Sequence, residues 1–291
     1  MGAPLCGHLL RAGYALTIYT RTPSKAEELL QQGATWADSP VELVANTDVV
    51  LTMVGFPAEV RALYLSPQGL LSLARVGQIF IDMTTSEPTL ARELTRVAQP
   101  QKAFALDAPV SGGDVGARNG TLSIMVGGDP AVFETVLPIL SVFSKTLVHH
   151  GSAGCGQHAK LCNQMTIAGT MIGVCEALLY AHRAGLDGET LLRSICSGAA
   201  GCWTLDHLAP RILKRDFGAG FFVEHFIKDM GIALDEAKRM GLLLPGLTLV
   251  RNLYLSIQSH GHGRSGTHAL LLALEDLSPT FLTADPSPHS R

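Results

Sequence analysis

Charged and aromatic residues are scarce in this chain. Only 16% of its 291 residues are charged and 6% are aromatic, whereas 47% are hydrophobic. This is the composition of a folded globular protein rather than a disordered one. The net charge of −3, without a basic stripe, argues against nucleic acid as a partner. The length is sufficient for two modest domains, each with its own core.

Metal-binding and export signals are also missing. The six cysteines include no Cys-x-x-Cys pair, and no His/Cys cluster has the spacing of a zinc site. The N-terminus lacks a basic region followed by an apolar run, so no signal peptide is predicted. We therefore expect reduced thiols, no metal and a cytoplasmic location.

One apolar stretch, residues 165–181, raises the question of a membrane span. A spanning helix needs roughly 20 mainly apolar residues. This stretch is shorter and contains Glu176, with Lys160 and Asn163 just before it. We expect a helix buried between layers of protein, and no membrane partner.

The first half of the chain alternates strand and helix patterns. Ser39 and Glu42 form a capping box that predicts one helix start, and Ser86 is predicted to cap a helix running toward residue 99. The alternation predicts an α/β Rossmann-type domain, with a mainly parallel sheet and helices on both faces. Strands are expected at residues 15–19, 49–54, 78–82, 103–107, 121–126 and 146–149.

The second half changes character after a glycine-rich junction at residues 151–156. No convincing strand follows it. We predict a Rossmann-like domain at 1–150, an all-α domain at 151–277 opened by a long interdomain helix, and a flexible tail at 278–291 rich in Pro, Ser and Thr. Helical patterns cover residues 157–184, 188–197, 204–214, 223–240, 245–260 and 267–277.

The start of the chain lacks what a dinucleotide-binding fold normally has there. Such a fold begins with a strand and a Gly-x-Gly turn, whereas this chain opens directly into a helix. Gly2 is either the last glycine of that fingerprint or an ordinary helix start. A missing central strand would leave neighbouring edges unpaired and remove the pyrophosphate cradle. We interpret this as truncation or a start codon set too late, and expect poor cofactor binding.

Arg21 and Thr22 follow the first predicted strand. No acidic residue stands there to accept hydrogen bonds from the ribose hydroxyls of NAD. Arg21 can instead pair with the 2′-phosphate of NADP, or it is simply a solvated surface arginine. The residues alone favour neither reading.

Ser111, Gly112 and Gly113 follow a strand at the carboxyl-end edge of the predicted sheet. The two glycines let backbone N–H groups approach a carboxylate, and Ser111 adds a hydroxyl donor. An ordinary turn that needs glycine flexibility is the plainer alternative.

Lys160, Asn163 and Gln164 share one face at the start of the long helix. An ammonium and an amide placed there can hold one small polar molecule. The dipole of the helix N-terminus and burial both disfavour the cation, which suits a proton donor working near neutral pH. A snorkelling surface lysine is the alternative, and it fits poorly beside so apolar a helix.

Lys228 and Asp229 form a charged pair within an otherwise apolar helical stretch. Such a pair is usually either functional or neutralised internally, and the alternative is a surface salt bridge.

Taken together, these motifs resemble the β-hydroxyacid dehydrogenase family, which includes 3-hydroxyisobutyrate dehydrogenase and tartronate semialdehyde reductase. The resemblance spans the chain from Met1 to about Leu277. It rests on residues 107–113, 154–164 and 226–229, in the family's order and spacing.

The resemblance implies specific roles. Lys160 corresponds to the family's catalytic lysine. The substrate would be a small carboxylate, the cofactor NAD or NADP with NADP slightly favoured, and the assembly a homodimer or homotetramer. The remaining positions implied are Ser111, Gly112, Gly113, Asn163 and Gln164 for the substrate, and Gly2, Arg21, Thr22, Met53, Val54, Thr85, Lys228 and Asp229 for the cofactor.

Two alternatives to such an oxidoreductase stay open. The missing first strand is compatible with a truncated, non-catalytic remnant that only dimerises. An imine reductase shares the scaffold but generally carries another residue where Lys160 stands.

Overall fold

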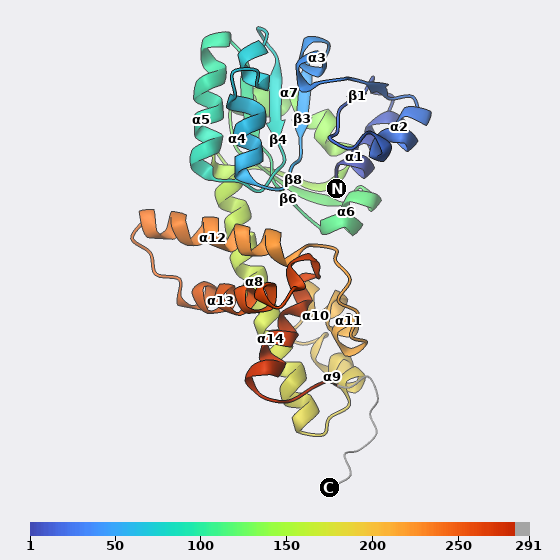
Figure 1. Cartoon of the computed structure of the whole chain (residues 1–291), viewed down its shortest axis with the longest axis vertical. Coiled ribbons are helices and arrows are strands. Elements are labelled where there is room, and N and C mark those ends of the chain that lie inside the picture. The colour runs from blue at the N-terminus through green and yellow to red at the C-terminus, as the bar shows by residue number, and fades with distance from the viewer. Residues whose placement is uncertain (283–291) are drawn as a thin grey trace. The chain divides into compact units, whose positions relative to one another are not determined.

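The computed structural model describes residues 1–282, which fall into two compact units that meet between Leu161 and Cys162 in the sequence (Figure 1). The first unit is α/β and the second is helical. The strands are β1 (Thr17–Ile18), β2 (Thr35–Trp36), β3 (Val49–Thr52), β4 (Ile79–Asp82), β5 (Phe104–Asp107), β6 (Val110–Ser111), β7 (Leu122–Val126) and β8 (Ser144–His149). The helices of the first unit are α1 (Gly2–Arg11), α2 (Glu27–Gln31), α3 (Pro40–Ala45), α4 (Pro57–Leu65), α5 (Pro88–Ala98), α6 (Gly113–Asn119) and α7 (Pro130–Ser141).

The strands of the first unit are mainly parallel, which confirms the predicted fold class. β3, β4 and β5 form one parallel sheet, β1 and β2 pair in parallel in a second, and β7 and β8 pair in parallel in a third, where β6 is the antiparallel member. Among residues 1–282, no strand precedes β1, and none pairs with the free edges of β1 and β3. Within the described residues, β1–β2 and β3–β4–β5 therefore form separate sheets.

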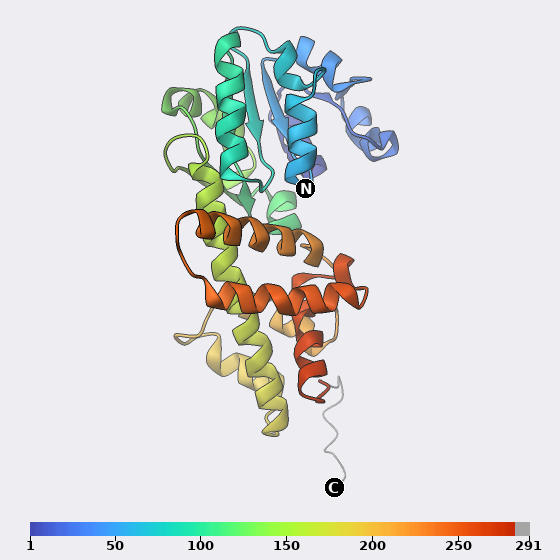
Figure 2. The same ribbon diagram turned by 60° about the vertical axis from the view of Figure 1, so that its left-hand side comes forward.

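A hydrophobic core lies on each face of the central sheet, because successive residues of a strand point to opposite faces. Ile79 and Ile81 of β4 pack into a cluster with α1, α6 and α7. Phe80, between them, points to the other face, where α4 and α5 lie side by side (Figures 1 and 2). All four residues of β4 are buried, as expected for a central parallel strand.

Four elements of this unit, β2, α4, β6 and α6, were not predicted from the sequence. β2 has only two residues, too few for a periodic signal, and the short β6 and α6 lie in a region interpreted as irregular. α4 does carry a start signal, since Glu59 accepts hydrogen bonds from the N–H groups of Gly55 (2.8 Å) and Phe56 (3.1 Å).

The predicted cap at Ser86 is wrong. Glu87 occupies the N-cap position of α5. The Ser86 N–H instead donates to the Gln157 side chain at 2.8 Å. This long-range bond has no signature in the local sequence.

The second unit is all-α in its described part, as predicted. Its elements are the remainder of α8 (Cys155–Arg183), α9 (Gly188–Ile195), α10 (Trp203–His207), α11 (Ala209–Leu213), α12 (Val223–Arg239), α13 (Pro245–Ser259) and α14 (Leu270–Leu277). The single helix predicted at 204–214 is two short helices that meet at Leu208. α12 and α13 lie side by side as a helical hairpin (Figures 1 and 2).

The long helix α8 is buried along one stripe only. Ala168, Met171, Cys175 and Leu178 are buried at the three- and four-residue spacing of one helix face. The expectation of a buried helix is therefore confirmed for that face. By length and composition alone α8 also qualifies to cross a membrane, a test that core helices of soluble proteins pass as well.

Part of the segment predicted as a flexible tail is packed. Leu282 is buried, its N–H donates to Glu275 Oε1 at 2.8 Å, and its carbonyl accepts from Arg215 at 2.9 Å. Residues 283–291 of the predicted tail lie outside the described residues.

Candidate active site

The loops after β3 and β4 are joined at the carboxyl edge of the central sheet. The Val54 N–H donates to Thr84 Oγ1 at 3.0 Å, which ties the loop carrying Met53 and Val54 to the loop carrying Thr85. Carboxyl ends of parallel strands form the ligand crevice of open α/β sheets. Three of the predicted cofactor-contacting residues are therefore brought together here.

The carboxylate of Asp82 holds these loops through hydrogen bonds. Its Oδ1 accepts hydrogen bonds from the Thr84 N–H (3.0 Å) and from Thr52 Oγ1 (3.2 Å), and Thr52 in turn contacts the hydroxyl of Tyr64 at 2.8 Å. Burial raises the pKa of Asp82 from 3.8 to about 6, although these hydrogen bonds favour the carboxylate.

The raised pKa of Asp82 predicts a specific pH dependence of stability. The folded state binds this proton more tightly than the unfolded state, so the stabilisation is complete below pH 3.8 and is lost as pH rises through about 6. For the wild type, the free energy of unfolding should fall between pH 4.5 and 7.5 by about 2 kcal/mol more than for Asp82→Asn. Asparagine keeps an acceptor oxygen for Thr84 and Thr52.

Urea denaturation of both proteins across that pH range measures the difference. Asp129→Asn, which alters a carboxylate capping α7, serves as the control. Parallel pH curves for the wild type and Asp82→Asn would contradict the assignment.

Asp107, at the end of β5, holds the start of α8. Its Oδ1 accepts the Gly154 N–H and its Oδ2 accepts the Gln157 N–H, both at 2.8 Å. Burial raises the pKa of Asp107, while these backbone bonds oppose the shift. A buried carboxylate thus satisfies backbone donors that the first turn of a helix otherwise leaves unpaired.

Glycines allow this close approach of helix and sheet. A Cβ on Gly156 would lie 2.7 Å from the Asp107 carbonyl oxygen and 2.8 Å from the Gly127 nitrogen, and would also clash with the Met125 carbonyl. Gly154 has a positive φ of 92°, which disfavours any residue with a side chain. The close packing of α8 against the sheet therefore requires glycines at this junction.

Lys160 lies on α8 in the turn that follows this anchored start. The residue is buried, with 6% of its surface exposed, so the snorkelling-surface alternative is excluded. The residue has an interaction partner within the protein. A buried lysine with a defined environment suits a proton-transfer role.

In the second unit, four predicted site residues are linked by two hydrogen bonds and one ion pair. Asn163 Nδ2 donates to Gln164 Oε1 at 2.7 Å, and Gln164 Nε2 donates to Asp229 Oδ2 at 2.6 Å. The other oxygen of Asp229 pairs with Lys228 Nζ at 2.8 Å. Asp229 is fully buried, so it acts through Lys228 and Gln164.

The Ser111-Gly112-Gly113 turn has the backbone geometry that the sequence predicted. Gly112 and Gly113 have φ values of 123° and 62°, in the region that favours glycine. Ser111 ends β6, which pairs with β7 through Ser123. The turn is therefore fixed by the sheet on one side and by α6 on the other.

Three other predicted cofactor positions lie after β1 and at the start of α1. The Arg21 guanidinium pairs with Glu59 Oε1 at 2.8 Å, and 79% of its side chain is exposed. Thr22, also exposed, begins a 3₁₀ turn without a side-chain cap. A Cβ on Gly2 would meet no atom within 4 Å, so packing gives no reason for a glycine there.

The residues of the first unit fit a nicotinamide dinucleotide. The N-terminus of α1 has no side-chain cap and no acidic residue in its first turn, which leaves N–H groups for an anionic group. Arg21 offers a cation in the segment after β1, and Val54 and Thr85 lie in the loops that follow β3 and β4.

Sequence reasoning missed Asp82, Asp107 and Gln157 as site residues. Asp82 and Asp107 each end a buried strand, a position that could have indicated them. The residues next to Gln157 in the sequence do not indicate that its side chain binds the backbone of Thr84 and Ser86.

Known proteins similar to this chain agree with this geometry. The profile of the NAD binding domain of 6-phosphogluconate dehydrogenase matches residues 1–151, and that of the NAD-binding domain of NADP-dependent 3-hydroxyisobutyrate dehydrogenase matches residues 154–274. A probable mitochondrial 3-hydroxyisobutyrate dehydrogenase-like protein of Arabidopsis thaliana is 52% identical over 288 residues, covering 99% of this chain and 86% of its own.

Two further proteins extend the comparison. The 2-hydroxy-3-oxopropionate reductase of Escherichia coli is 35% identical over 275 residues and covers 94% of each chain. The structure of 3-hydroxyisobutyrate dehydrogenase from Mycobacterium tuberculosis with L-serine has a TM-score of 0.85 at 32% identity, covering 94% of this chain and 95% of its own.

Fold, site and similarity define an NAD(P)-binding oxidoreductase. The chain belongs to the β-hydroxyacid dehydrogenase family, as the sequence motifs predicted, and is an NAD(P)-dependent hydroxyacid dehydrogenase.

Proposed function

We propose that this protein interconverts a small 3-hydroxy acid and its semialdehyde, with Lys160 as the general acid–base residue. The observation that carries the proposal is the burial of Lys160 one helical turn beyond the anchored start of α8. That start is bound to the loop carrying Thr85, at the edge of the sheet where a dinucleotide binds.

The proposed chemistry requires one proton transfer from the protein. The nicotinamide, when bound, accepts or supplies the hydride. During oxidation, the neutral amine of Lys160 takes the proton of the substrate hydroxyl as the carbon beneath becomes a carbonyl. During reduction, the ammonium returns that proton to the carbonyl oxygen, so charge never accumulates on the oxygen.

The remaining site residues bind and orient. We assign the substrate carboxylate to Ser111, Gly112 and Gly113, whose turn presents N–H groups and a hydroxyl. We assign orientation of the substrate to Asn163 and Gln164, whose amides are fixed by the chain of hydrogen bonds through Asp229.

An assay with candidate substrates tests the reaction. 2-Hydroxy-3-oxopropionate, 3-hydroxyisobutyrate and L-serine, which appear in the names of similar proteins, are the first to try with each cofactor. Turnover of a compound of this class, followed by the absorbance of the reduced nicotinamide, is expected. Binding of NADPH without turnover of any 3-hydroxy acid or semialdehyde would contradict the proposal.

We assign the cofactor preference to Arg21. Charge-assisted hydrogen bonds from its guanidinium to a 2′-phosphate should favour NADP over NAD. Arg21→Gln should raise the KM for NADPH about tenfold, because such bonds contribute roughly 1.5–3 kcal/mol, and leave the KM for NADH within twofold.

Steady-state kinetics with both cofactors measure this change. Arg61→Gln is the matched control, since Arg61 forms a comparable surface pair with Glu93 at 2.8 Å. Equal effects of Arg21→Gln on NADPH and NADH would exclude recognition of the phosphate.

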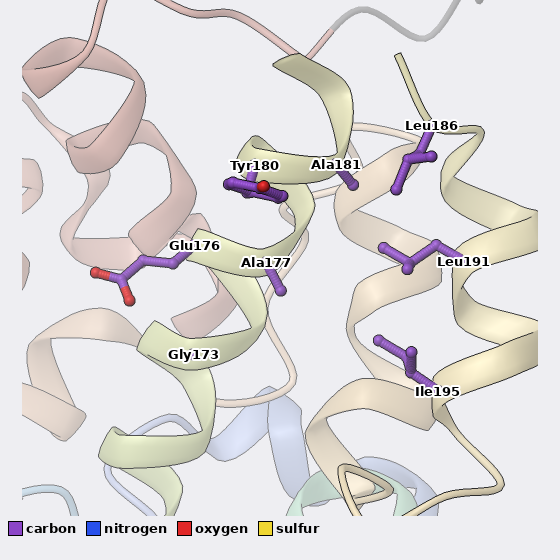
Figure 3. Close-up of a pocket in the computed structure, with 8 residues that line it drawn as sticks. All are labelled: Gly173, Glu176, Ala177, Tyr180, Ala181, Leu186, Leu191 and Ile195. Atoms are coloured by element: carbon purple, nitrogen blue, oxygen red, sulfur yellow. The ribbon is translucent and has the colours of Figure 1, made fainter. Parts of the chain in front are cut away.

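We also propose a homodimer or homotetramer in the cytoplasm, and its supporting observation lies in the second unit. Ala177 and Ala181 of α8 face Leu191 and Ile195 of α9 across an open apolar groove, which Tyr180 also lines (Figure 3). The Tyr180 side chain is among the most exposed large hydrophobic ones in the described chain. A second copy would cover this surface, and sedimentation equilibrium tests whether the protein self-associates.

A further inference from the structure

Gln157, a residue outside every predicted site, spans the loop that carries Thr85. It is fully buried in the first turn of α8. Its side-chain Oε1 accepts the Ser86 N–H and its Nε2 donates to the Thr84 carbonyl, both at 2.8 Å. The amide therefore binds the peptide groups on both sides of Thr85 and fixes its backbone.

The same residue is held by its main chain. The Gln157 N–H donates to Asp107 Oδ2, while Oδ1 of the same carboxylate accepts from Gly154. The ends of β4 and β5 are thus both bonded to one helical turn. The groups that form these hydrogen bonds are buried, so removing one partner would leave the other unpaired and would destabilise the folded protein.

Lys160 lies three residues beyond Gln157, so the two share one face of α8. Helical side chains lean toward the N-terminus, which brings Lys160 back over the turn that Gln157 anchors. Any rotation or shift of that turn moves the amine relative to Thr85.

We propose that Gln157 and Asp107 are positioning residues that set the amine of Lys160 against the Thr85 loop. The proposal rests on the function proposed above, in which Lys160 moves the proton and Thr85 contacts the cofactor. Catalysis of hydride and proton transfer requires both partners in one geometry, and a displacement of about 1 Å can cost 10²-fold in rate. The buried side-chain amide of Gln157 would fix the position of Lys160 relative to the Thr85 loop.

Another buried glutamine separates this role from simple stabilisation. Gln78 immediately precedes β4, at the opposite end of the same strand. Its Nε2 donates to the carbonyls of Val44 (2.8 Å) and Thr47 (2.7 Å), and its Oε1 accepts from Arg75 (3.0 Å). Like Gln157, it is buried and its side-chain amide both donates and accepts hydrogen bonds, but it lies at the end of β4 opposite the candidate site.

The experiment compares Gln157→Leu with Gln78→Leu in the full chain. Both should lower the thermal midpoint by similar amounts. Gln157→Leu should also lower kcat 10- to 100-fold with little change in the KM for the hydroxy acid, whereas Gln78→Leu should keep kcat within twofold. Gln157→Glu, which keeps an acceptor for Ser86, should fall between the wild type and Gln157→Leu, and it decides the question if Gln157→Leu does not fold.

A second readout identifies the step affected. In a Lys160→Met background, Gln157→Leu should lower kcat by less than twofold, because both residues serve the same proton transfer. Equal kcat for folded Gln157→Leu and Gln78→Leu, or full additivity with Lys160→Met, would overturn the positioning role. Wild-type kcat in Lys160→Met alone would instead overturn the proposed function.

Discussion

Replacing Lys160 with methionine should lower kcat by roughly 10²–10⁴-fold, the usual contribution of a positioned acid–base group. Methionine matches the length of the aliphatic stem and suits a site where only 6% of the residue is exposed. The fold and the affinity for the cofactor should therefore be retained. Without the amine, the hydroxyl proton has no acceptor in the proposed mechanism while the hydride leaves.

The control for this variant is Lys145→Met. Lys145 is an exposed lysine on β8 of the same unit, and its replacement should leave kcat within twofold. Circular dichroism and NADPH titration establish that both variants are folded and bind. A near-normal kcat for Lys160→Met would contradict the assignment of Lys160 as the acid–base residue, whatever the effect of the substitution on KM.

Gly156→Ala should have the largest effect on stability. The added Cβ would meet the backbone atoms of Met125, Asp107 and Gly127, none of which can rotate away as a side-chain tip can. Relief requires α8 to move from the sheet, which would break the bonds from Asp107 to Gly154 and Gln157. Overpacking of this kind costs about 3 kcal/mol or more, which corresponds to roughly 6–12 °C in the melting temperature of a unit this size.

Gly169→Ala is the matched control for this substitution. Gly169 lies on the same helix, and a Cβ there would meet no atom within 4 Å. Its replacement should raise the free energy of unfolding by up to about 1 kcal/mol through helix propensity. Thermal denaturation of both variants measures the two effects. Equal stability of Gly156→Ala and the wild type would contradict the close packing of α8 against the sheet at Gly156.

The long periodic elements could be predicted from the sequence because their signals are local. The burial of β4 follows from its uninterrupted apolar run, and α3 begins at Pro40 after Ser39, whose Oγ accepts the Glu42 N–H at 3.2 Å. The glycines at 112 and 113 predicted a turn that needs glycine flexibility, and both residues adopt a positive φ. In each case, the physical cause lies within a few residues of the pattern.

The contacts that hold the candidate site together could not be predicted in the same way. The bond from Gln157 to Ser86 joins residues 71 positions apart, and the bond from Gln164 to Asp229 joins residues 65 apart. Asp229 pairs with Gln164 through one oxygen and with Lys228 through the other. A buried polar residue needs hydrogen-bond partners, but the residues next to it in the sequence do not indicate which partners it finds.

The pH dependence of hydride transfer in a single turnover tests the central claim most directly. Stopped-flow mixing of enzyme and oxidised cofactor with a hydroxy acid gives the rate constant for this step, free of product release. We predict that the wild-type rate rises with pH along a single ionisation, as the amine of Lys160 becomes neutral, and that the rate of Lys160→Met is low and flat over the same range. A Lys160→Met rate that keeps the wild-type ionisation would show that another group moves the proton.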